Sequence, residues 1–198
     1  MKKTLSTVAA FVLILGGIGV RAAIKYHNEH ESAETTINCH GVSFTIPGDW
    51  RPDDAGKPDR CKYQSGHSQA LIVVRLEVPH VLTPEEAKEA ATQKDQDYAT
   101  AARAIATRNG ENLQIDPPIP YEWGSLQTVQ RTVTYADTGH LVAIYTMISP
   151  TDATTLVLEA EKMNPGSFKQ MYLRIFEAAR KANSASVLAP SQRDGGEE

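Results

Sequence analysis

The sequence predicts an α+β protein, with an antiparallel β-sheet of about 5–6 strands and two main α-helices packed on it. Three observations predict this class. Short segments alternate between apolar and polar residues, and one long segment carries the signals of a helix start and stop. The last helix-length segment has an apolar stripe at helical spacing. Because strands and helices come in separate runs, the sheet is expected to be antiparallel.

Two strands are predicted before the long helix. Val42, Phe44 and Ile46 alternate with polar residues, which is typical of a strand with one buried face, and Pro47-Gly48 ends it. Residues Ala70 to Val78 are apolar enough on both faces to lie inside a sheet.

The segment from Pro84 to Asn109 is predicted to be a helix. Thr83 can cap its start, Glu86 completes a capping box, and Gly110 provides a stop. Its predicted inward stripe consists of Ala87, Ala91, Tyr98, Ala102 and Ile105. Since these residues are mostly small, we expect close packing on a sheet, which argues against a ligand-carrying pocket beneath this helix.

The second half of the chain predicts a short strand at 113–115, then three strands in a meander and a closing helix. The meander strands are Leu126–Tyr135, Leu141–Ile148 and Thr155–Ala160. The middle strand is apolar on both faces and needs cover on both sides. Asn164-Pro165 opens the last helix, whose apolar stripe is Phe168, Met171, Tyr172, Ile175, Phe176 and Ala179.

Residues 1–24 are expected to be a signal peptide or a membrane anchor helix. Lys2 and Lys3 precede an uncharged apolar run, and Arg21 ends it. As a helix the run would rise about 24 Å, short of a hydrocarbon core of about 30 Å, so cleavage and tethering both remain open. The expected organisation continues with a linker at 25–36, one domain at 37–182 and a disordered tail at 183–198.

Charge and cysteines bear on the compartment and the partners. The chain has 20 basic and 24 acidic residues, and removing residues 1–22 changes its net charge from −4 to −7. The basic residues are scattered, so nucleic acid is not an expected partner, and the membrane is expected to be contacted only through an uncleaved N-terminal segment. The only cysteines, Cys39 and Cys61, are expected to form a disulfide, which suits an exported protein. Each lies beside a predicted strand, and the two side chains come within bridging distance if those strands pair as an antiparallel hairpin. We therefore expect the domain in the periplasm, free or tethered to the inner membrane by a single span.

The sequence contains no recognisable catalytic set, so no catalytic residues, no cofactor and no metal site are predicted. His27 and His30 are spaced for a metal on one helical turn, but they lie in the expected linker without a third ligand nearby. The pair Asp95 and Asp97 is interpreted as solvated helix surface. A hydrolase would become the better hypothesis if the fold placed two of His40, His67, His80 or His140 beside a carboxylate in one cleft.

The segment from Pro117 to Trp123 is the best candidate for a binding surface. Pro120 stiffens it, and Tyr121 and Trp123 are large amphipathic anchors for a protein partner. The alternative is that Trp123 folds back and covers the edge of the sheet. The loop from Trp50 to Arg60 is a second candidate.

The residues Phe44-x-Ile46-Pro47-x-x-Trp50, together with the order of elements, resemble the PsbP-like and DcrB-like group of small exported α+β domains. The resemblance covers roughly residues 37–182. It implies a non-enzymatic binding or accessory role and brings no catalytic residues. The cysteine pair and the proline-rich loop depart from the group's pattern, which leaves the kind of partner open.

The expected function is that of a non-enzymatic protein-binding or accessory domain in the cell envelope. One specific form is an immunity protein that neutralises a toxin delivered to the envelope, for which the acidic charge suits a basic partner. A hydrolase whose active site is invisible in the sequence is the second alternative.

Overall fold

The computed structural model describes residues 34–39, 42–53, 60–66, 68–76 and 78–188, the last four without their side chains. The expected signal or anchor segment, most of the expected linker, and residues 189–198 lie outside the described residues. Neither helix of the described part has an apolar stretch long enough to cross a bilayer.

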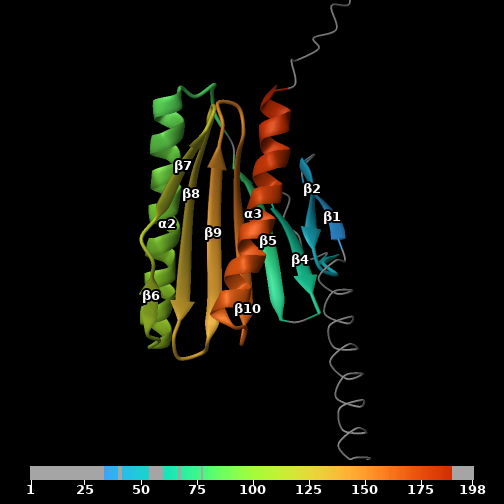
Figure 1. The fold of residues 1–198 in the computed structure, drawn as a ribbon. Coiled ribbons are helices and arrows are strands. Elements are labelled where there is room, and N and C mark those ends of the chain that lie inside the picture. The colour runs from blue at the N-terminus through green and yellow to red at the C-terminus, as the bar shows by residue number, and fades with distance from the viewer. Residues whose placement is uncertain (1–33, 40–41, 54–59, 67, 77, 189–198) are drawn as a thin grey trace, which may run out of the picture.

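The centre of the fold is an eight-stranded sheet with the strand order β3-β4-β5-β10-β9-β8-β6, in which β7 also pairs with β8 (Figure 1). Its strands are β3 (Arg51–Pro52), β4 (Arg60–Ser65), β5 (Gln69–Leu76), β6 (Leu113–Ile115), β7 (Ile119–Trp123), β8 (Leu126–Tyr135), β9 (His140–Ile148) and β10 (Ala153–Glu161). Every pair is antiparallel. The predicted α+β class and the predicted short strand at 113–115 are therefore confirmed, and the strands β3, β4 and β7, which were not expected, make the sheet wider.

A separate two-stranded hairpin consists of β1 (Glu34–Cys39) and β2 (Val42–Pro47). β1 begins inside the segment that was expected to be linker. The hairpin contributes Ile37, Phe44 and Ile46 to the largest core cluster, which also contains the apolar stripe of α3 (Pro165–Leu188). It therefore covers one part of the main sheet as a small second layer.

Cys39 and Cys61 form the predicted disulfide, with their Cα atoms 5.8 Å apart. An antiparallel hairpin between two neighbouring strands is not what brings them together, however. Cys39 ends β1 in the small sheet, and Cys61 lies in β4 of the main sheet. The disulfide consequently joins two layers of the fold instead of two neighbouring strands.

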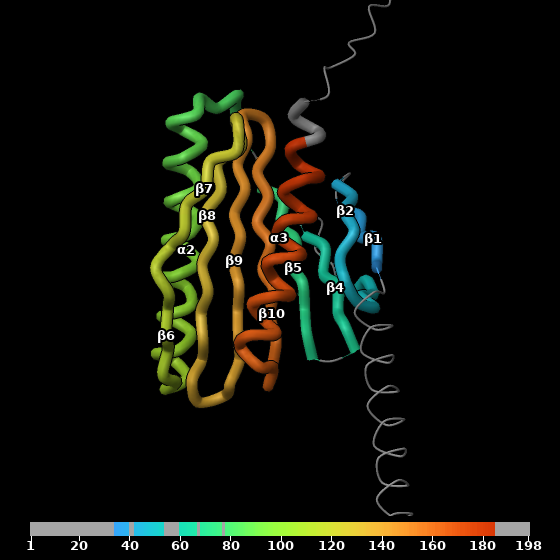
Figure 2. The backbone as a smooth tube through the Cα atoms, viewed as in Figure 1, coloured from blue at the N-terminus to red at the C-terminus, as the bar shows by residue number. Residues whose placement is uncertain are grey.

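The two helices pack on opposite faces of the sheet, one over β6, β8 and β9 near one edge and the other over the central strands β9 and β10 (Figure 2). Ala143, Tyr145 and Met147 of β9 lie in the core with α3, and Val142 and Ile144 of the same strand pack with α2 (Pro84–Asn109). Because successive strand residues point to opposite faces, one apolar strand supplies both cores. The predicted two-sided cover of this strand is confirmed. α3 continues to Leu188, past the end expected at residue 182.

The boundaries of α2 agree with those predicted from its end signals. The Thr83 hydroxyl accepts from the Glu86 backbone N–H at 3.2 Å, and the Glu86 carboxylate accepts from the Thr83 backbone N–H at 2.7 Å. These bonds lower the pKa of Glu86 below its ordinary value. At the other end Gly110 has φ 68°, a left-handed conformation that glycine adopts without steric strain.

The buried stripe of α2 differs from the predicted one. It consists of Ala87, Ala91, Asp95, Ala99, Ala102 and Ala106. Ile105 is 45% exposed, so its predicted inward position is wrong. Asp95 is buried, so its interpretation as solvated surface is also wrong.

Candidate functional site

The predicted partner-binding residues Pro120, Tyr121 and Trp123 lie in β7, which pairs with β8 in the register Tyr121–Thr128. The expectation of a loop is wrong at residues 119–123, since these residues form a strand. β6 and β7 both pair with β8 on the side away from β9, so they form the outer edge of the sheet in the described structure. An edge strand tolerates proline because an N–H that faces away from the neighbouring strand is not needed for pairing.

Three large side chains of β7 share one face. Ile119, Tyr121 and Trp123 alternate along the strand and therefore point to the same side. They are 45%, 52% and 57% exposed. Trp123 therefore does not fold back to cover the edge of the sheet, because more than half of this residue is accessible to solvent. The result is an exposed apolar row, which we call the β7 row.

The end of the β7 row is positioned by α3. The guanidinium carbon of Arg180 lies 4.0 Å from the centre of the Trp123 ring, a cation–π contact. It places a positive charge at the end of the β7 row, so this surface offers both an aromatic contact area and a cation.

The polar face of β8 beside the β7 row is occupied by hydrogen bonds. The Thr128 hydroxyl donates to the backbone oxygen of Tyr121 at 3.1 Å. Burial raises the pKa of the Tyr145 hydroxyl, and a hydrogen bond with Thr128 offsets part of this rise. Burial likewise raises the pKa of Tyr172, which hydrogen-bonds with Gln130. These phenols are therefore neutral at physiological pH and serve as structural hydrogen-bonding groups.

A buried ion pair, which the sequence interpretation missed, fixes the entry of the chain into β7. Arg131 Nε donates to Asp95 Oδ1 at 2.7 Å, and Arg131 Nη2 also contacts Asp95 Oδ2. Arg131 Nη1 donates to the Asp116 backbone oxygen at 3.0 Å. The side chain of Asp116 accepts from Thr132. One cation thereby connects α2, β8 and the segment that precedes β7.

The described parts of the other candidate loop and the two described histidines, His80 and His140, do not form a site. Trp50 is buried and its indole N–H donates to the Pro47 oxygen at 2.8 Å, while residues 54–59 lie outside the described residues. His80 lies 3.7 Å from Glu86 at the start of α2, and His140 stacks on Tyr135 in another part of the fold. His27, His30, His40 and His67 are outside the described residues. Within the described part, no three metal-ligating side chains come together.

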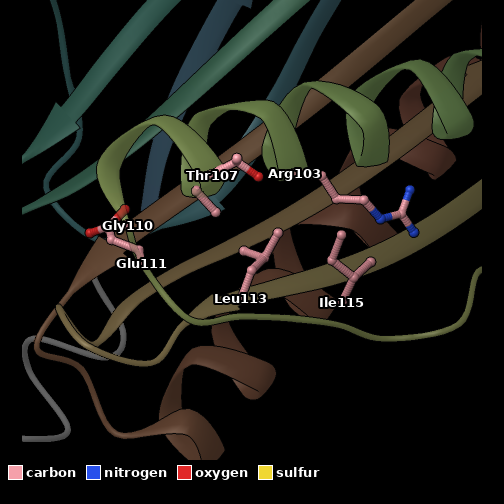
Figure 3. Close-up of a pocket in the computed structure, with 7 residues that line it drawn as sticks. Arg103, Thr107, Gly110, Glu111, Leu113 and Ile115 are labelled. Carbon is pink, nitrogen blue, oxygen red and sulfur yellow. The ribbon is translucent and has the colours of Figure 1, made fainter.

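Two cavities flank α2. The first, of about 430 Å³, lies between the end of α2 and β6. Figure 3 shows Leu113 and Ile115 rising from β6 toward the helix, with Arg103 and Glu111 at opposite ends. Its charged groups do not converge, so it offers no catalytic arrangement. The second cavity, of about 330 Å³, lies between the first half of α2 and strands β7 and β8.

Comparison with known proteins gives similarities to solved structures alone. No protein-family model matches the chain, and no curated protein sequence matches it. Among solved structures, it is similar to the solution structure of cyanobacterial PsbP (CyanoP) from Synechocystis sp. PCC 6803, with a TM-score of 0.49, 11% sequence identity, and coverage of 76% of this chain and 91% of that chain.

Proposed function

We propose that this chain is a non-enzymatic protein-binding or accessory domain of the cell envelope, which docks a protein partner through the β7 row. The observation that carries the proposal is the exposure of Ile119, Tyr121 and Trp123 side by side on one edge strand. Aromatic side chains of this kind supply much of the binding energy at protein interfaces.

The β7 row is also preorganised for binding. β7 is held by β8 through its whole length, and Arg180 lies against Trp123. Side chains that are already ordered lose little conformational entropy when a partner docks. Such a surface supports docking better than chemistry, because the hydroxyls beside it are neutral and hydrogen-bonded.

The proposed location is the periplasm, with or without a tether to the inner membrane through residues 1–24. The disulfide between Cys39 and Cys61 supports an oxidising compartment, since disulfides are rare in the reducing cytosol.

A second form of the same function is an immunity protein that neutralises a toxin delivered to the envelope. The supporting observation is the acidic charge of the chain, −4 in total. A basic partner would be attracted by this charge and would associate faster at low salt.

The double variant Tyr121→Ala/Trp123→Ala tests the docking surface. The full-length protein is purified from mildly solubilised envelopes, with cross-linking, and its stoichiometric partner is identified by mass spectrometry. We expect the variant to lose at least about tenfold in affinity for that partner, which corresponds to one hot-spot residue. Its melting temperature should change by less than about 2 °C, because both side chains are exposed.

The matched control is Ile105→Ala, which removes a large exposed side chain from α2 and should leave binding intact. Equal binding by wild type and the double variant would show that the surface assignment is wrong. The absence of any partner, even after cross-linking, would overturn the docking function itself. If a partner is found, its own activity distinguishes immunity from assembly.

A further inference from the structure

Leu173 extends the β7 row onto α3. It is 44% exposed and lies seven residues before Arg180, so both side chains project from the same side of the helix. That side faces β7, since Arg180 contacts Trp123. Four of the six large apolar residues that are exposed in the described structure therefore belong to one surface, namely Ile119, Tyr121, Trp123 and Leu173. We call these four residues, together with Arg180, the β7–α3 surface.

The β7–α3 surface has an apolar end and a cationic end. Tyr172, which precedes Leu173 in α3, hydrogen-bonds with Gln130 of β8. Gln130 is the register partner of Ile119, so Leu173 and Ile119 lie at the same end of the surface. Arg180 lies about two helical turns further along α3. A partner that covers the whole surface therefore contacts apolar side chains first and a guanidinium beyond them.

Arg180 has no ion-pair partner among the described residues. Glu177, one turn before it, forms its ion pair with Lys181 at 2.9 Å instead. The contact with Trp123 occupies one face of the guanidinium, whereas the N–H groups lie at the rim of its plane. The rim is thus free to bind a bidentate acceptor, such as a carboxylate, while the contact with Trp123 is kept.

The edge strand itself opposes pairing with a further strand. Pro120 of β7 has no backbone N–H to donate, and Lys88 of α2 forms an ion pair with Glu122 of β7 at 2.9 Å. Proline and charged side chains on an edge strand disfavour the addition of another strand. Recognition at this edge consequently depends on side chains, which again points to the β7–α3 surface.

We propose that the docked partner is a protein segment with a carboxylate flanked by apolar side chains, and that Arg180 binds this carboxylate. The inference rests on the proposed docking function and specifies the chemistry of the partner. Paired charges fix the register of an interface, and the Arg–carboxylate pair is the bidentate form of such a contact. The net charge of −4 acts on the approach of a partner, whereas Arg180 acts in the contact itself. An anionic lipid surface is a poorer match, because the same net charge opposes it.

Photocrosslinking identifies the segment that docks. Leu173→p-benzoyl-phenylalanine is made in the full-length protein, intact cells are irradiated, and the cross-linked peptides are sequenced by mass spectrometry. We expect a partner segment with Asp or Glu between apolar residues. The matched control is Ile105→p-benzoyl-phenylalanine on α2, which is equally exposed and should not give this product. A cross-linked segment without Asp or Glu would overturn the inference, and no protein cross-link from Leu173 or from Ile119 would overturn the docking function as well.

Variants of Arg180 separate this inference from the docking function. Arg180→Gln should bind the cross-linked partner at least about tenfold more weakly, because the partner's carboxylate is left unpaired. Arg180→Lys should lose less, since it keeps the charge but not the bidentate geometry. Arg174→Gln removes another exposed arginine of α3 and should bind like the wild type. Unchanged affinity of Arg180→Gln, with weaker binding of Tyr121→Ala/Trp123→Ala, would overturn this inference and leave the docking function standing.

Charge reversal excludes an indirect effect through Trp123. Arg180→Glu should abolish binding, and replacing the partner's acidic residue with arginine should restore it, because the pair is then re-formed with opposite signs. Failure of the exchanged pair to recover any affinity would show that Arg180 does not contact that carboxylate.

Two capped peptides test the chemistry without the partner. Acetyl-Leu-Glu-Leu-amide and acetyl-Leu-Gln-Leu-amide differ only in the carboxylate, and NMR follows the indole N–H resonance of Trp123 in the full-length protein in detergent. The buried Trp50 indole, which donates to the Pro47 oxygen, is the internal reference. We expect saturable shifts with the Glu peptide and at least about threefold weaker binding of the Gln peptide, a difference typical of an exposed ion pair. Equal binding of the two peptides, binding of neither, or Arg180-dependent binding to phosphatidylglycerol vesicles instead would overturn the proposal.

Discussion

Arg131 and Asp95 form the charged pair that is most deeply buried in the described structure, with side chains 9% and 3% exposed. Removing charges from water is costly, and close contact with further hydrogen bonds offsets that cost. Asp95 supplies both carboxylate oxygens, and the Asp116 backbone oxygen accepts another bond from the guanidinium. The pair therefore depends on both partners being present.

Removing one member of this pair should destabilise the protein strongly. We expect Arg131→Met to lower the free energy of unfolding by about 3 kcal/mol, because Asp95 is left as an uncompensated buried charge. The double variant Asp95→Leu/Arg131→Met should recover much of that loss. Both effects are measured by urea unfolding.

The control is Lys181→Met, which breaks an exposed pair with Glu177 in α3 and should cost less than about 1 kcal/mol. If Arg131→Met costs no more than this control, the Arg131–Asp95 pair is not an important stabilising contact.

The position of Asp95 could have been predicted from the sequence. It lies four residues from both Ala91 and Ala99, on the same helical stripe as the buried alanines. A carboxylate on an apolar stripe requires a buried cation, and Arg131 occurs in a strand of otherwise uncharged residues. What the sequence does not contain is the pairing itself, because Asp95 and Arg131 are brought together only when α2 packs on β8.

At the scale of elements, α2 was predictable and β7 was not. Thr83, Glu86 and Gly110 give local signals for the two ends of the helix, and these signals act without tertiary contacts. Pro117, Pro118 and Pro120 give equally clear local signals for a loop. Pairing with β8 overrides them from residue 119 onward, since an edge strand needs only half of its backbone groups for pairing.

The first hairpin was also only partly predicted. Val42 to Ile46 has the alternation of a strand, whereas the Glu34-Thr35-Thr36 segment before it is polar and reads as a linker. This polar segment is nevertheless part of β1, which is held in place by pairing with β2 and by the disulfide at Cys39. The cysteine pairing was predictable because the chain has only two cysteines. That the disulfide would join the β1–β2 hairpin to the main sheet was not predictable from the sequence.

Loss of the disulfide should act mainly on the β1–β2 hairpin. We expect the double variant Cys39→Ser/Cys61→Ser to lower the free energy of unfolding by about 3 kcal/mol, the amount expected for a crosslink of this loop length. Hydrogen exchange should become faster in β1 and β2, while β8 and β9 keep their protection, because those strands are held by pairing on both sides. Uniform loss of protection in all strands would contradict this assignment.

At the scale of the whole molecule, the fold class followed from the order of elements and from β9, which is apolar on both faces and therefore needs two covering layers. The strand order did not follow. β5 pairs with β10, and the intervening chain contains α2 and four of the other strands, β6 to β9. No local pattern specifies such a pairing, because it depends on how the layers assemble.

The predicted export of the whole chain has a direct chemical readout. In cells that make the full-length protein, Cys39 and Cys61 should resist thiol labelling until a reductant is added. Deleting residues 1–24 should retain the chain in the cytosol and make both cysteines reactive, because the cytosol keeps thiols reduced. The measurement is the mass shift after alkylation in intact lysates. Reactive thiols in the full-length protein would argue against an oxidising compartment.

The position of the disulfide determines how the domain responds to a pulling force. A force applied to the chain at Glu34 enters the fold through β1, which can peel away from β2 one residue pair at a time. At Cys39 the load passes through the sulfur bridge to Cys61 and reaches β4 directly. The segment between the two cysteines, residues 40–60, which includes β2 and Trp50, then carries no tension. When the domain is pulled from its N-terminal side, the segment between the two cysteines should therefore bear no load until β4 separates from the sheet.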